Sequence, residues 1–107
     1  MDIITNLSIE DKERFIKVNK LYLNYIGEDV ESLLEYLPNK LHTSTSADIL
    51  IMLLPRTAVR LKDTNLDAAR QVGELLTKFK KLNLDEDGVF ESILFEMEEV
   101  AEKYQIQ

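Results

Sequence analysis

The chain of 107 residues contains no cysteine or tryptophan and has only one histidine, two prolines and three glycines. Without cysteine there is no disulfide framework, no thiolate nucleophile and no cysteine-ligated zinc. The single histidine, His42, excludes a multi-histidine metal site within one chain, and no catalytic signature surrounds it. The scattered glycines exclude a phosphate-binding loop of the Walker or Rossmann type. These absences predict a protein that is not an enzyme and needs no cofactor.

Long hydrophobic runs are also absent. The longest continuous apolar run covers the six residues 49–54, whereas a bilayer-spanning helix needs about 20. Residues 1–9 carry one acid and no base, which differs from the basic start and apolar stretch of a signal peptide. We therefore expect a soluble, cytoplasmic protein that does not interact with a membrane.

The charge is unevenly distributed along the chain. In total, 20 acids against 13 bases give a formal net charge of -7. Residues 1–55 carry -4 and residues 56–84 carry +4, so residues 85–107, with eight acids and one base, account for the whole imbalance. An acidic balance argues against nucleic-acid binding, because affinity for phosphates comes mainly from Lys and Arg.

The apolar residues recur mostly at helical spacing, and the few glycines and prolines exclude a barrel or sandwich with many tight turns. We predict an all-α fold, a compact single-domain bundle of four to five helices over residues 1–107. The first expected helix runs from Ser8 to near Gly27, and the second and third cover 29–37 and 47–61. The fourth runs from Thr64 to about Leu82, and the fifth follows a polar link at 83–87 and ends at about Tyr104.

Helix-start signals support these boundaries. Ser8, Thr45 and Thr64 each precede an Asp at the third following position, which is a form of the capping box. Pro55 lies inside the third expected helix, where it should kink or split the helix. A buried strand over 49–54 is the competing interpretation, since a short apolar run does not distinguish the two.

The link before the last helix resembles a calcium-binding EF-hand loop. Asn83, Asp85, Asp87 and Gly88 match its first, third, fifth and sixth positions, whereas Leu94 replaces the final bidentate Glu. The resemblance implies a weak divalent-ion-binding module with a degenerate loop at 83–94, and Ca²⁺ as its ligand.

Acid pairs in several expected helices are similar to those of MazG-type pyrophosphatases, in which facing carboxylates hold Mg²⁺. Glu10 with Glu13 and Glu96 with Glu99 have this spacing, but the Asp of that pattern is missing. Acids in the first turn of a helix also favour its dipole, so a solvated helix face explains them without a metal.

The last helix carries the main functional hypothesis. Its apolar positions form two heptads, and the outer side places Phe95 among glutamates. We expect Phe95 to be buried either between neighbouring helices or by another chain, and Leu94 to widen its patch. The predicted partner-binding residues are Phe95, Leu94, Glu91, Glu98 and Glu102.

This surface predicts a small acidic protein-interaction module, such as a regulator, inhibitor or assembly accessory. Its partner would be a protein with a basic surface or a second copy of the chain. The simpler interpretation is a solubilising acidic face that Lys78, Lys80 and Lys81 of the preceding helix partly balance.

Overall fold

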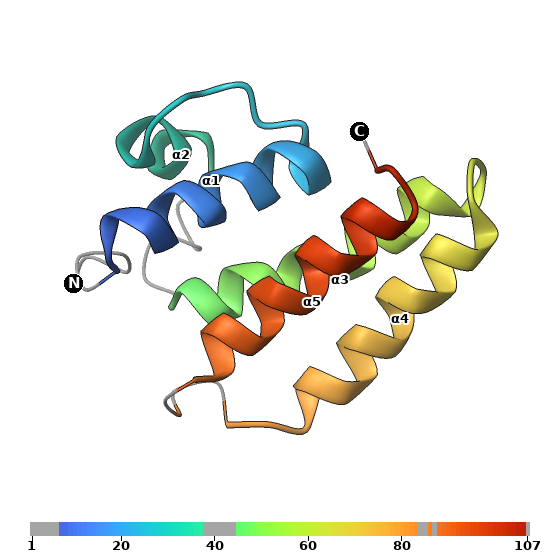
Figure 1. The fold of residues 1–107 in the computed structure, drawn as a ribbon. Helices are drawn as coiled ribbons and strands as arrows, with labels where there is room; N and C mark the ends of the chain where they lie inside the picture. The colour runs from blue at the N-terminus through green and yellow to red at the C-terminus, as the bar shows by residue number, and fades with distance from the viewer. Residues whose placement is uncertain (1–6, 38–44, 84–85, 87, 107) are drawn as a thin grey trace.

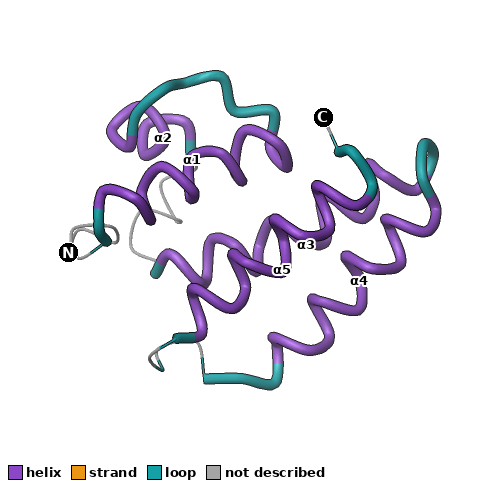
Figure 2. Tube along the Cα trace, in the orientation of Figure 1, coloured by secondary structure: helices purple, strands orange, loops and turns teal. Residues whose placement is uncertain are grey.

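The computed structural model describes residues 7–37, 45–83, 86 and 88–106, and the regular structure in these ranges is entirely α-helical (Figure 2). It comprises α1 (Ile9–Leu23), α2 (Val30–Tyr36), α3 (Ser46–Lys62), α4 (Leu66–Lys80) and α5 (Val89–Lys103). The predicted all-α bundle is confirmed, and no helix of the described residues is long and apolar enough to cross a membrane.

The helices pack around α3 and α5. In Figure 1, α5 passes in front of α3, with α1 on one side and α4 on the other. The most extensive contact joins α3 to α4, and α5 contacts α1, α3 and α4. The short helix α2 lies beside α1 at the edge of the bundle. One side of α5 is therefore enclosed by helices, and the opposite side faces outward.

Two of the predicted helix starts are confirmed in atomic detail. The Ser8 hydroxyl accepts a hydrogen bond from the Asp11 amide at 3.1 Å, and Thr45 and Asp48 form a reciprocal capping box at the start of α3. The third start lies one residue later than Thr64 predicts, because the Asn65 side chain caps α4 by accepting a hydrogen bond from the Ala68 amide. Asn is generally the stronger N-cap residue.

The third expected helix is confirmed, and the competing strand is not formed. Residues 49–54 are helical rather than a strand, and α3 continues through Pro55 without splitting. An interior proline costs about 3 kcal/mol. Buried residues on both sides of it, including Leu53, Leu54 and Leu61, gain more than that from burial at about 1.5–3 kcal/mol each.

The end of α1 also differs from expectation. The helix stops at Leu23, where Asn24 adopts a left-handed conformation with φ of 59°. Gly27 lies beyond this end, and a Cβ there would overlap the Tyr25 side chain. Because the chain turns at Asn24, Tyr25 is buried but Ile26 is 89% exposed.

Arg60 of α3 holds this end of α1 in place. Its guanidinium donates to the backbone carbonyl oxygens of Leu21 at 2.9 Å and Tyr22 at 3.4 Å, and to the side-chain oxygen of Asn24 at 3.2 Å. The last carbonyls of a helix lack partners within the helix and carry partial negative charge. A cation from α3 therefore fixes where α1 ends relative to the rest of the bundle.

The core consists of two clusters. The larger joins α1, α3, α4 and α5, and the smaller joins α1, α2 and the start of α3. Phe90 packs against both clusters, and its ring lies 5.7 Å from that of Phe15 between centroids. The first turn of α5 thus connects the clusters.

Thr57 provides a test of this core. Its side chain is fully buried, and its hydroxyl has no hydrogen-bond partner among the described residues. A buried polar group without a partner costs free energy. We expect Thr57→Val to raise the free energy of unfolding by about 1 kcal/mol, measured by urea denaturation.

The matched control is Thr77→Val on α4. The Thr77 hydroxyl is exposed and donates to the Gly73 carbonyl oxygen at 3.2 Å, so the same substitution should give no such gain. A loss of stability in Thr57→Val would contradict the prediction.

Candidate functional site

The buried face of α5 is wider than the predicted heptad seam. Ile93, Met97 and Val100 are buried as expected, but Leu94 and Ala101 are buried with them. The prediction that Leu94 widens an exposed patch is therefore wrong. Leu94 is fully enclosed because α5 packs against three helices rather than along one seam.

Phe95 lies on the opposite, outward side of α5. Its side chain is 55% exposed, so the neighbouring helices do not bury it. Burial of Phe95 by another chain, the alternative expectation, stays a prediction. Three exposed glutamates share this side of the helix at helical spacing: Glu91, Glu99 and Glu102. We call Glu91, Phe95, Glu99 and Glu102 the acidic crest.

The glutamates of α5 differ in their partners. Lys78 of α4 contacts both carboxylate oxygens of Glu96 at 2.9 Å, and Arg14 of α1 contacts Glu98, the closest N–O distance being 2.6 Å. Glu91, Glu99 and Glu102 form no ion pair within the described part of the chain. The balancing role predicted for Lys78 is thus observed, and it leaves the crest glutamates uncompensated.

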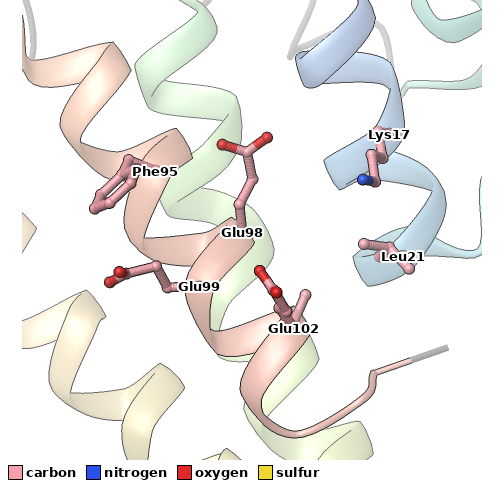
Figure 3. Close-up of a pocket in the computed structure, with 7 residues that line it drawn as sticks. Lys17, Leu21, Phe95, Glu98, Glu99 and Glu102 are labelled. Carbon is pink, nitrogen blue, oxygen red and sulfur yellow. The ribbon is translucent and has the colours of Figure 1, made fainter.

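Two grooves border α5, and Phe95 and Glu99 line both of them. The groove towards α1 has a volume of about 470 Å³. In Figure 3, Lys17 and Leu21 of α1 face Glu98 and Glu102 across this groove, whereas the side chains of Phe95 and Glu99 point away from α1. The groove towards α4 has a volume of about 480 Å³.

Hydrogen bonds fix the position of α1 beside α5. The buried Tyr22 hydroxyl donates to the Met97 carbonyl oxygen at 2.7 Å, and the Arg14 guanidinium donates to both oxygens of Glu98. The hydrogen bond to Glu98 raises the pKa of Arg14 above the ordinary value of an arginine side chain. Glu98, a predicted partner-binding residue, is therefore already bound within the chain, with about a quarter of its side chain exposed (27%).

The predicted ion-binding residues are only partly described. Asp85 and Asp87 lie outside the described residues, as does His42. Asn83 is exposed, and Gly88 caps α5 with φ of 86°. Among the described residues no group of three or more acidic or histidine side chains is placed to hold a metal. Leu94, at the position of the missing Glu, is buried and has no oxygen to offer.

Several residues of this surface were missed by sequence reasoning. The expected helix reaches about Leu82, but α4 ends at Lys80 and Leu82 is 42% exposed at the rim of the groove towards α4. Arg14, Lys17 and Ser92 carried no signal, because each is an ordinary surface residue of an amphipathic helix. Only the packing of α1 beside α5 places Arg14 against Glu98 and Lys17 in a groove, and only the packing of α4 makes Ser92 part of a groove.

Comparison with protein-family models finds no match for this chain, and comparisons with curated proteins and with solved structures find none either. The surface around α5 must therefore be interpreted from its own chemistry.

Tyr22 yields a pH-dependent prediction about the contact between α1 and α5. Burial raises the pKa of Tyr22, although the nearby Arg60 acts in the opposite direction. In the folded protein the phenol stays neutral above about pH 10, where an unfolded tyrosine ionises. The unfolded state then binds fewer protons than the folded state, so stability falls as the pH rises.

We expect Tyr22→Phe to lose about 1 kcal/mol at neutral pH, because the hydrogen bond to Met97 is removed. Its stability should then fall less steeply than that of the wild type above about pH 10. Urea denaturation between neutral and alkaline pH measures both effects. Tyr36→Phe, at a half-exposed site, is the control. Equal alkaline slopes in Tyr22→Phe and the wild type would refute the prediction.

Proposed function

We propose that this protein is a small, non-enzymatic protein-interaction module whose acidic crest binds a basic surface of another protein. Such a module would act as a regulator, an inhibitor or an assembly accessory. The observation that carries the proposal is the exposure of Phe95 beside glutamates that have no ion-pair partner in the described residues.

The two components of the crest have different roles in this proposal. Phe95 supplies apolar area, and exposed aromatic side chains commonly become the energetic anchors of interfaces once they are desolvated. Glu91, Glu99 and Glu102 attract a cationic partner and orient its approach, which raises the association rate and makes it salt-dependent. Binding also relieves the repulsion between like charges spaced along one helix face, which is worth a few tenths of a kcal/mol per pair.

Charge favours a basic partner over a second copy of the chain. A symmetric dimer centred on Phe95 would place the glutamates of the two crests against each other, and like charges across an interface are costly. The same glutamates would repel nucleic-acid phosphates.

The ion-binding alternative at residues 83–94 makes a different prediction. An ion binder responds to Ca²⁺ by calorimetry or by a change in melting temperature, and is insensitive to moderate NaCl. The crest should behave in the opposite way, with binding that weakens as NaCl screens the charges.

The proposal is tested with crest variants in affinity purification from the organism that encodes the protein. Phe95→Ser and the double variant Glu99→Lys/Glu102→Lys should each recover about tenfold less of the wild-type partner or worse. Because these side chains are exposed, the melting temperature should change little. Partner recovery by the wild type should also fall when NaCl is raised from about 0.05 to 0.5 M.

Two control variants match these changes at a distance from α5. Ile26→Ser removes an apolar side chain that is 89% exposed, and Glu31→Lys reverses an exposed acid on α2. Both should retain the partner. Undiminished recovery by the crest variants, or a homodimer in sedimentation that depends on Phe95, would overturn the proposal.

A further inference from the structure

The groove between α4 and α5 is more apolar than the acidic crest beside it. Phe79 and Val89 form buried parts of its wall, and Leu82 and Phe95 are exposed at its rim by 42% and 55%. Gly88 and Ser92, the small residues of the lining, leave the space between these rims open. The groove therefore contains an apolar hollow between Leu82 and Phe95.

Three charged side chains line this hollow: Lys78, Glu96 and Glu99. Lys78 and Glu96 pair with each other, so they largely cancel. Glu99 is exposed and makes no ion pair with any described residue. It lies one helical turn beyond Phe95, and both side chains extend to the same side of α5 (Figure 3). An uncompensated carboxylate thus adjoins the hollow.

We infer that this hollow takes one apolar side chain of a cationic amphipathic helix, and that Glu99 binds a Lys or Arg one turn along the same helix. The inference rests on the proposed function and specifies the chemistry of the partner. Residues four apart on a helix are about 6 Å apart along its axis, and Glu99 follows Phe95, at the rim of the hollow, by the same four residues. Amphipathic helices commonly bind in grooves through such anchors.

A helix suits this site better than an extended peptide. The described residues offer no strand edge, so an extended peptide would leave backbone N–H and C=O groups unpaired against an apolar surface. A helix satisfies these groups internally. The groove towards α1 is a poorer seat for an apolar anchor, because only Leu21, Phe95 and Ala101 line it with apolar side chains and the rest of its lining is charged.

The inference is tested with two synthetic helical peptides of about 15 residues and the full-length protein, using isothermal titration calorimetry. One peptide places Leu and Arg one turn apart on one face, and the other has the same composition with the Arg on the opposite face. The wild type should bind the first peptide at least about tenfold more tightly than the second. Glu99→Gln should abolish that preference.

Ser92→Phe tests the hollow itself, because it fills the space without changing any charge. It should weaken binding of the first peptide by about tenfold or more. Thr77→Phe adds the same ring to α4 outside this groove, at an exposed position, and should leave the affinity unchanged. If thermal melting shows that Ser92→Phe is unfolded, the charge-neutral Leu82→Ser at the exposed rim replaces it and should also weaken binding of the first peptide.

The outcomes separate this inference from the proposed function. Equal binding of both peptides, or binding that survives Ser92→Phe and Leu82→Ser, would overturn the hollow as the anchor site. The crest would still stand as a cation-binding surface if Phe95→Ser and Glu99→Lys/Glu102→Lys lose the native partner. Failure of the wild type to bind either peptide would also refute the inference, whatever the crest variants do in affinity purification.

Discussion

The packing of α5 against α1, α3 and α4 at once is the constraint on which the other features of this bundle depend. Ile93, Leu94 and Met97 are completely buried by it, and each buried side chain of this size contributes about 1.5–3 kcal/mol relative to exposure. Because three neighbours enclose one side of α5, the helix has little freedom to rotate. The outward direction of Phe95, and the grooves on either side of it, follow from that fixed orientation.

The ion pairs at the surface of the bundle do not determine how its helices pack. Ion pairs that are partly exposed, such as Arg14 with Glu98, contribute at most about 1 kcal/mol, which is less than one buried leucine. Their main effect is on the charge that remains exposed. Arg14 and Lys78 neutralise the glutamates at the two edges of α5, so uncompensated negative charge is concentrated along the crest, next to Phe95.

The candidate site combines charge with apolar surface, because apolar side chains that the core does not enclose lie beside the uncompensated glutamates. The end of α4 at Lys80 leaves Leu82 outside the core, and the small side chain of Ser92 leaves room between Leu82 and Phe95. A partner that covers this region would bury apolar area and neutralise Glu99 together. Complementarity of both kinds in one place is what separates a specific interface from a merely solubilising surface.

The sequence by itself determined the helical class, the local starts at Ser8 and Thr45, and the placement of Phe95 opposite the apolar face of α5. These features depend on side-chain hydrogen bonds within one turn and on helical periodicity, which act between residues close in the chain. Tertiary structure alone decided that Leu94 is buried, that Ile26 is exposed and that Glu98 pairs with Arg14. Each of these outcomes depends on which helices become neighbours, and periodicity within a single helix carries no information about that.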